Sequence, residues 1–450
     1  MTERPRGVRR WRGPIEEFVQ AHPRWTSVLV VLGALFVGTI ILSMFTPLGR
    51  RPERIWATAT PPVSSPAFVL AVAGSVHAPH YVGGRAEVLN NGVQFVPAIL
   101  RDIRTARRSV NFMAYMWEAG TMSDAVVAAL EERARAGVAV RVVLDAWGGY
   151  KIPTGDIRRL EAAGVRVHTF RPLQWGKLTR FHRRNHRRAI VIDGEIGYTG
   201  GAAVSDKWLG DAANPEQWRD TMVRVTGPLA ESLQAAFAQL WASSYGEILV
   251  GPAFYPEDAA GGTRGAAISE HINVISSPAD DSHPLRKVFW LSFMAARERL
   301  WITNSYFVPD EHIREALKNR ARAGVDVRIL LPNQHTDAAV VRYAGHKYFE
   351  ELLAAGVKIY EYQPTMMHAK QMVVDGAWSV VGSANLDVRS KELNQENVLG
   401  VLDDQFARQL EATFLADLRQ AREIRLDTWR RRGYWARIRE DFSVVFEEQF

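Results

Sequence analysis

Two stretches of sequence decide the fold: HRRAIVIDG at His186–Gly194 and HAKQMVVDG at His368–Gly376. Each places a cation two residues after a histidine and an aspartate seven residues after it. Composition alone would produce roughly 0.07 such triplets in a chain like this one, so two are improbable as chance. The two stretches therefore indicate a repeated unit.

Further matches keep the same order along the chain. RARAGV occurs at Arg133–Val138 and again at Arg320–Val325, and AAGV occurs at Ala162–Val165 and Ala354–Val357. Short Ala/Arg strings arise easily in helices, but several collinear matches do not. The sequence therefore predicts a duplication with small insertions.

Each copy alternates helical and strand-like segments. The spacing predicts helices over Ser123–Ala136 and Glu311–Ala323, each ended by a glycine, and short β-branched runs that predict buried strands. This alternation is typical of an α/β sandwich with a largely buried sheet. We expect two halves, residues 86–250 and 268–425, joined by a Gly/Ala/Pro-rich linker at 251–267.

Composition bounds the chemistry. The 450 residues contain no cysteine, which excludes disulfides, thiolate nucleophiles, iron–sulfur clusters and cysteine-bound zinc. The net charge of +7 favours an anionic partner, either nucleic acid or an anionic membrane surface.

The amino-terminal region reads as a membrane anchor. Residues 26–45 form an uncharged apolar run of the length that crosses a hydrocarbon core of about 30 Å. A core helix would carry a polar stripe, and the small-x-small pattern at Ala57–Ala59 lies too far from the run for a signal-peptide cleavage site. Six arginines precede the run and three follow it, which predicts a cytoplasmic basic segment (1–25), a linker (46–85) and an extracytoplasmic catalytic part of a cell-membrane protein.

The repeated motif suits phosphoryl chemistry. On a strand, His368 and Lys370 project from one face, so that a cation can bind phosphate oxygens while the imidazole attacks or transfers a proton. Ser383 and Asn385, again two apart, can donate further hydrogen bonds, and Glu396 can hold an imidazole tautomer. Two halves face to face would supply the nucleophile and the acid of a metal-free double displacement at a phosphodiester.

A metal site is not expected. His182 and His186 have a possible metal-pair spacing, but five arginines crowd them and would repel a divalent cation. We predict neither a metal nor a cofactor.

From about Val88 to Arg422, the chain resembles the phospholipase D superfamily, on its duplicated H-x-K-x4-D motif followed by G-S-x-N. Further strings resemble bacterial cardiolipin synthases: Trp218-Arg219-Asp220, Asn304–Asp310 (NSYFVPD), Asn385–Ser390 (NLDVRS) and Asn394-Gln395-Glu396. The resemblance implies two tandem phospholipase D-like α/β sandwich halves forming a pseudo-twofold unit after one transmembrane helix. It also implies one active site at the seam.

The resemblance further implies a role for each site residue. His186 would form a phosphohistidine with a phosphatidyl group and His368 would protonate the leaving alcohol, with the exchange of roles open. The other implied roles are phosphate binding by Lys370, Arg188, Ser383 and Asn385, orientation of the histidines by Asp220 and Glu396, and bracing of the motif by Asp193 and Asp375.

Three residues depart from the family's pattern. Arg188 replaces the motif lysine, Ala203 replaces an asparagine, and Gly201 replaces the serine of the second copy. The first half-site therefore has fewer hydrogen-bond donors than the second.

The leading interpretation is a membrane-anchored phosphatidyltransferase acting between two phosphatidylglycerol molecules, with anionic lipid and membrane as partners and no nucleic acid. A phospholipase, a nuclease and a degenerate lipid-binding protein are the alternatives. The aromatic and arginine-rich end, residues 426–450, is an amphipathic segment for an anionic bilayer or an ordinary surface helix.

Overall fold

The computed structural model describes residues 21–45, 55–174, 182–256, 269–278 and 282–445. The chain divides into two units, residues 1–47 and residues 48–450. The first unit contains one long helix, α2 (Pro23–Phe45), whose apolar side chains, such as Val30 and Phe36, are exposed. Among the described residues, no helix reaches the combined length and apolarity of a membrane span. The predicted transmembrane helix at 26–45 therefore stays a prediction.

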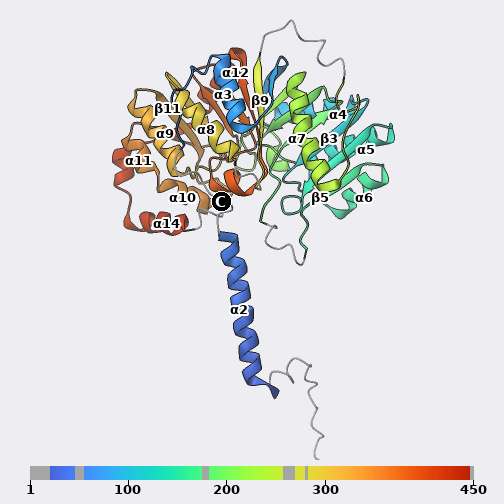
Figure 1. The fold of residues 1–450 in the computed structure, drawn as a ribbon, viewed down its shortest axis with the longest axis horizontal. Coiled ribbons are helices and arrows are strands. Elements are labelled where there is room, and N and C mark those ends of the chain that lie inside the picture. The colour runs from blue at the N-terminus through green and yellow to red at the C-terminus, as the bar shows by residue number, and fades with distance from the viewer. Residues whose placement is uncertain (1–20, 46–54, 175–181, 257–268, 279–281, 446–450) are drawn as a thin grey trace, which may run out of the picture. The chain divides into compact units, whose positions relative to one another are not determined.

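The second unit contains two sheets, which appear side by side in Figure 1. The smaller sheet belongs to the first half of the chain and has seven strands. In spatial order they are β2 (Arg85–Asn90), β8 (Thr221–Thr226), β7 (Ile196–Gly200), β6 (Ala189–Ile192), β3 (Ser109–Ala114), β4 (Ala139–Asp145) and β5 (Arg166–Phe170).

The larger sheet has nine strands. In spatial order they are β1 (His80–Val82), β9 (Glu270–Ile275), β15 (Asn397–Leu402), β14 (Trp378–Gly382), β13 (Gln371–Val374), β10 (Arg299–Thr303), β11 (Asp326–Pro332), β12 (Lys358–Tyr362) and β16 (Ala421–Ile424).

The two sheets repeat one topology. Strands β3, β4 and β5 are parallel to one another, as are β10, β11 and β12. In each sheet the motif strand, β6 or β13, pairs antiparallel with the first of these three and with the strand that follows the motif. The tandem α/β halves predicted from the repeats are thus confirmed.

Helices cover the sheets on both faces, as the buried β-branched strands require. The helices of the first half are α4 (Asn91–Arg104), α5 (Thr121–Arg135), α6 (Thr154–Ala162) and α7 (Pro228–Tyr245). Those of the second half are α8 (Pro284–Ala295), α9 (Glu311–Arg322), α10 (Ala339–His346), α11 (Phe349–Ala354) and α12 (Asp404–Leu418). Both predicted helices, α5 and α9, are present and shifted by at most two residues.

The linker predicted at 46–85 was wrong in its second part. Residues 66–76 form helix α3 (Pro66–Val76), and residues 80–82 form β1, which pairs with β9 of the larger sheet. Phe68, Val69 and Val72 on α3 are fully buried in the core of the second half. The apolar face of this helix therefore contributes to a core most of whose other members lie about 200 or more residues away in sequence.

A shared apolar cluster joins the two halves. Val191, Val223 and Leu233 of the first half pack with Val381, Leu399, Phe406 and other residues of the second. Helix α7 contacts β9 of the opposite sheet, and α12 contacts β2. The site between the halves therefore lies on a continuous core rather than on a flexible joint.

Candidate active site

The two motifs lie where a chain segment of one half meets a segment of the other. The backbone N–H of His186 donates to the Gln395 carbonyl (2.8 Å), and that of His368 donates to the Arg219 carbonyl (2.7 Å). Isolated bridges, Asn185 with Gln395 and Arg219 with Met367, extend these contacts. The residue after Gln395 is Glu396 and the residue after Arg219 is Asp220, so each histidine is placed beside a carboxylate.

Each histidine is held by a carboxylate from the other half. Nδ1 of His186 lies 2.8 and 3.0 Å from the two carboxyl oxygens of Glu396, and Nδ1 of His368 lies 2.8 Å from Oδ2 of Asp220. A carboxylate at Nδ1 fixes the tautomer and leaves Nε2 for chemistry. The spacing within one repeat gave no sign that the pairs cross between the halves.

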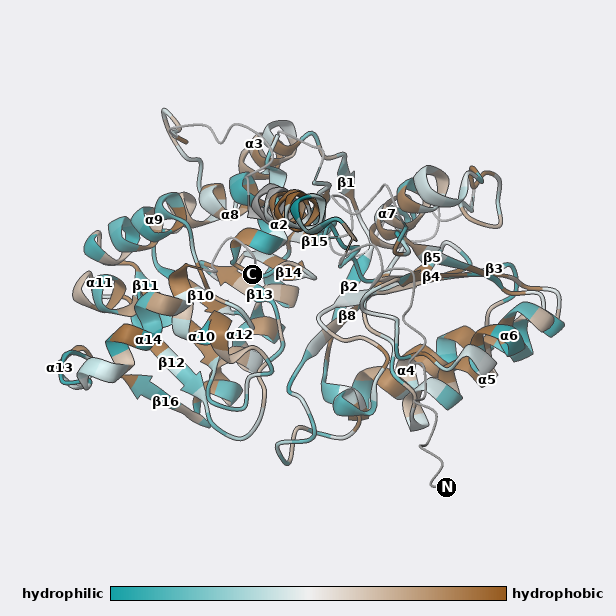
Figure 2. Ribbon diagram, turned by 90° about the horizontal axis from the view of Figure 1, so that it is seen from below, coloured by the Kyte–Doolittle hydropathy of each residue, from teal (hydrophilic) through white to brown (hydrophobic). Residues whose placement is uncertain are grey.

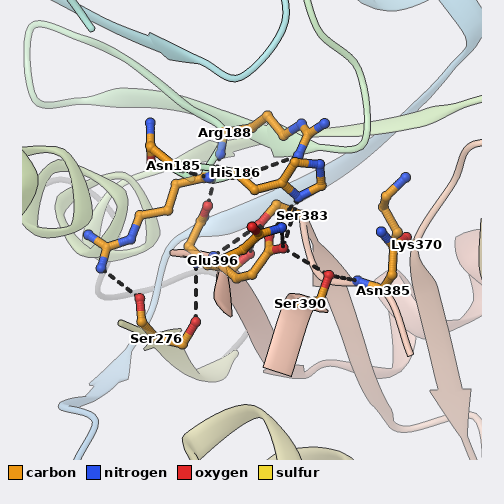
Figure 3. Close-up of polar contacts among 12 residues, drawn as sticks. Asn185, His186, Arg188, Ser276, Lys370, Ser383, Asn385, Ser390 and Glu396 are labelled. Atoms are coloured by element: carbon orange, nitrogen blue, oxygen red, sulfur yellow. Dashed lines mark hydrogen bonds and ion pairs between the residues drawn. The ribbon is translucent and has the colours of Figure 1, made fainter. Parts of the chain in front are cut away.

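The two carboxylates are themselves held by different donors. Glu396 accepts hydrogen bonds from the hydroxyls of Ser383 and Ser390 (Figure 3). Asp220 accepts from the indole N–H of Trp208 and the backbone N–H of Thr221, both at 2.8 Å. The first half therefore uses an indole where the second uses serine.

Ser383, for which the sequence predicted phosphate binding, hydrogen-bonds to Glu396 and does not line the cavity. Its hydroxyl donates to Glu396, and its side-chain oxygen accepts from the backbone N–H of Asn397 (3.0 Å). The residue is fully buried and is absent from the lining of the cavity between the histidines. It orients Glu396, because a hydroxyl with both roles filled has little to offer a phosphate.

Lys370 and Arg188 are the cations beside the histidines. The ammonium of Lys370 donates to the Ser305 hydroxyl and to the His368 carbonyl, both at 2.6 Å, and lies 3.1 Å from Nε2 of His368. The Arg188 guanidinium donates to the His186 carbonyl (2.7 Å). Both side chains are buried, and burial lowers the pKa of Lys370 to about 7.

The two dyads differ in their electrostatics. Burial raises the pKa of Glu396 to about 8. Burial opposes the ionisation of Asp220, but hydrogen bonds from His368 and Trp208, together with the charges of His368 and Lys370, outweigh it and lower the pKa of Asp220. Burial lowers the pKa of His368 to about 4 and holds that of His186 well below its usual value. Both imidazoles are therefore neutral near pH 7, as attack on phosphorus requires.

A cavity of about 260 Å³ connects the two histidines. Besides His186, His368, Arg188 and Asn385, its wall contains residues that the sequence did not single out: Tyr115, Trp208, Tyr306, Asp337, Asp387 and Arg389. Tyr306 belongs to the NSYFVPD string, and Asp387 and Arg389 belong to the NLDVRS string, so a signal for these three residues was present in the sequence.

Asp193 and Asp375 lie outside this cavity. Each has a positive φ (56° and 52°), and its carboxylate accepts backbone N–H groups in the turn before β3 or β10. They fix the turn that begins the central strand of each half. Among the described residues, no group of three or more His, Asp or Glu side chains is arranged to hold a metal ion.

The fold and the paired H-x-[K/R]-x4-D motifs define a phospholipase D-like enzyme. A family model described as the PLD-like domain of cardiolipin synthase matches residues 99–241 and 292–418. The chain belongs to this cardiolipin synthase family of the phospholipase D superfamily.

Several relatives show the extent of the match. The cardiolipin synthase A of Pseudomonas fluorescens (strain SBW25) is 36% identical over 84% of this chain and 78% of its own length. The probable cardiolipin synthase YwiE of Bacillus subtilis (strain 168) is 33% identical over 80% and 71%. A solved phosphatidylserine synthase of Haemophilus influenzae shares the fold, with a TM-score of 0.64 at 14% identity over 84% of this chain and 97% of its own.

Proposed function

We propose that this protein transfers a phosphatidyl group from one phosphatidylglycerol molecule to another and releases glycerol. The observation that carries the proposal is the pair of crossed dyads, His186–Glu396 and His368–Asp220, whose histidines line one cavity. The buried cation Arg188 also lines this cavity, and the buried Lys370 lies beside the ring of His368. A neutral imidazole with Nε2 available can attack phosphorus, and the second imidazole, once it has received a proton at Nε2, can pass that proton to the leaving oxygen. The relatives are named as cardiolipin synthases, and this supports phosphatidylglycerol as both donor and acceptor.

In the first step, Nε2 of His186 attacks the phosphodiester, a P–N bond forms and the P–O bond to glycerol breaks. His368 protonates the departing glycerol oxygen. The Lys370 ammonium, 3.1 Å from Nε2 and 3.2 Å from Nδ1 of His368, is the proton source beside that ring, whereas the described hydrogen bonds of His186 run through Nδ1 and the backbone. This difference supports His186 as nucleophile and His368 as acid.

In the second step, His368 takes the proton of a hydroxyl on the second phosphatidylglycerol, and that oxygen displaces His186 from phosphorus. The non-bridging oxygens carry the negative charge, and Arg188, Lys370 and Asn385 are the groups placed to bind them. Asp220 and Glu396 stabilise each imidazole while it carries a positive charge.

A membrane location follows from the substrate. Residues 26–45 form an apolar segment within helix α2, and we propose that it anchors the enzyme in the cell membrane. The arginine bias around the segment supports a cytoplasmic amino terminus with the catalytic part outside the cytoplasm.

The test is to incubate the purified full-length protein with phosphatidylglycerol vesicles and follow the lipids by mass spectrometry. Cardiolipin with an equal amount of glycerol is the expected result. Phosphatidic acid alone would instead mean that water accepts the phosphatidyl group, and cleavage of added plasmid DNA without lipid turnover would overturn the proposal.

A further inference from the structure

Helix α14 (Tyr434–Val444) and the residue after it expose an apolar strip on the second half of the molecule. The exposed apolar side chains are Tyr434, Trp435, Ile438, Phe442 and Val445, and Trp435 is 79% exposed. At about 100° per residue these five cover roughly 100° of the helix circumference. The opposite face contains the buried residues Glu440 and Ser443.

The strip lies close to the cavity that holds the histidines. Helix α14 packs against α10, and Val444 joins an apolar cluster with Val341 and Ala338. Val341 and Ala338 also line the cavity. Figure 2 shows α14 and α10 on the same side of the molecule. Helix α10 therefore lies between α14, which carries the strip, and the cavity.

A second exposed apolar group flanks the cavity from the first half. Trp147 and Tyr150, 56% and 69% exposed, lie in the loop after β4. The backbone of this loop packs on Tyr115, another cavity residue, because Gly148 lies so close that an added Cβ would fall 2.1 Å from the Tyr115 carbonyl oxygen. Exposed aromatic side chains thus lie on both sides of the cavity.

Among the described residues that follow Trp429, arginines outnumber acidic residues, while Glu447 and Glu448 come after them in the sequence. Between Trp429 and Val445 there are five arginines and two acidic residues, Glu440 and Asp441. Glu440 pairs with Arg432 and Asp441 pairs with Lys347. Arg431, Arg437 and Arg439 are exposed and form no ion pair with any described residue. Arginine beside aromatic and aliphatic side chains fits a bilayer interface that carries anionic headgroups.

We propose that α14 is an interfacial helix, whose strip Tyr434, Trp435, Ile438, Phe442 and Val445 inserts into an anionic bilayer and presents the cavity to its lipid substrate. The proposal rests on the lipid substrate proposed above and adds the surface by which the catalytic part contacts the membrane. It is independent of the anchor, because an anchor tethers the catalytic part without orienting it.

The test uses the full chain, whose lack of cysteine makes any single introduced thiol a unique labelling site. Spin labels are placed at Trp435→Cys, at Phe442→Cys and, as a matched control on the same helix outside the strip, at Arg437→Cys. In phosphatidylglycerol-containing vesicles, the labels at 435 and 442 should be more accessible to oxygen than to a water-soluble nickel chelate, and the label at 437 the reverse. Equal nickel accessibility at all three sites would overturn the proposal and leave a protein partner as the ligand of the strip.

A kinetic measurement separates docking from structural support. The double variant Trp435→Glu/Phe442→Glu should raise KM for phosphatidylglycerol in vesicles about tenfold and leave kcat/KM for a short-chain, monomeric phosphatidylglycerol unchanged. An equal fall for both substrates would contradict the proposal, because it would mean that the helix supports the fold. If the wild-type protein makes no cardiolipin, the proposed function fails, and the label depths still decide the docking surface.

Discussion

At the scale of single residues, the two half-sites reach one geometry with different side chains. Gly201 stands where the second copy has Ser383, and an added Cβ would lie 2.4 Å from Oδ1 of Asp220 and 2.7 Å from the His368 carbonyl. The missing serine is therefore required by the close approach of Asp220, and Trp208 supplies the donor in its place.

Gly201→Ala should push the Asp220 carboxylate away from His368. We expect kcat to fall about 100-fold, since displacing a catalytic group by about 1 Å costs that much. Steady-state kinetics with phosphatidylglycerol vesicles measures the effect, and circular dichroism checks the fold. Gly155→Ala on α6, where an added Cβ meets nothing within 4 Å, is the matched control. Full activity of Gly201→Ala would contradict the tight packing at the dyad.

Arg188 is the second departure from the family's pattern. It is buried, lines the cavity and keeps the positive charge of the lysine that it replaces. We expect Arg188→Lys to retain kcat/KM within about tenfold and Arg188→Gln to lose 100- to 1000-fold, roughly the effect of removing one charge-stabilising donor. Arg158→Gln, an exposed arginine on α6, controls for the lost charge. Equal activity of all three variants would mean that Arg188 does not bind phosphate.

The titration of two buried groups predicts the pH profile. The mechanism needs Glu396 ionised, which occurs above a pKa of about 8, and Lys370 protonated, which occurs below a pKa of about 7. The reactive form is a minority at every pH and peaks midway, so kcat/KM should be bell-shaped with a maximum near pH 7.5. Lys370→Arg stays charged and should remove the alkaline decline up to about pH 9. An unchanged alkaline limb in this variant would show that another group causes it.

At the level of helices and strands, an acid-sensitive position outside the active site is predicted to lie on β9. His271 is fully buried there, between β1 and β15, with its ring 5.3 Å from that of Tyr81, and burial lowers its pKa to about 3. The unfolded chain binds a proton near pH 6.5 that the folded chain does not bind until about pH 3. Stability therefore falls as the pH drops through this window, by about 1.4 kcal/mol per pH unit for this one group.

In His271→Leu, the free energy of unfolding should fall less steeply as the pH drops from 7 to 4, because one fewer proton is taken up on unfolding. The measurement is urea unfolding at several pH values between 4 and 7, with the free energy of unfolding plotted against pH. An unchanged slope would mean that His271 is protonated equally in both states.

Some of the helices and strands could be predicted from the sequence, and others could not. The repeated motifs predicted both halves, the motif strands and the helices α5 and α9, because hydrophobic period and glycine stops are local signals. The pairing of β1 with β9 and the burial of α3 were missed, because both depend on partners about 200 residues away. The crossing of Glu396 to His186 was missed for the same reason.

At the scale of the whole molecule, the crossed dyads make the active site a property of both halves together. Neither motif histidine is paired with a carboxylate of its own half, and the apolar cluster between the halves fixes their relative position. The second half therefore supplies two groups to the site: the second histidine, His368, and Glu396, the carboxylate that holds His186.

The central claim is that one histidine attacks and the other transfers the proton. Phosphatidyl-p-nitrophenol tests it most directly, because nitrophenolate leaves without an acid. His368→Ala should release a burst of one nitrophenolate per chain, stall for want of a base, and carry the phosphatidyl group on His186 in alkaline-quenched mass spectra. His186→Ala should give no burst. A burst from His186→Ala with none from His368→Ala, or turnover by the wild type with no histidine adduct in any form, would contradict the account.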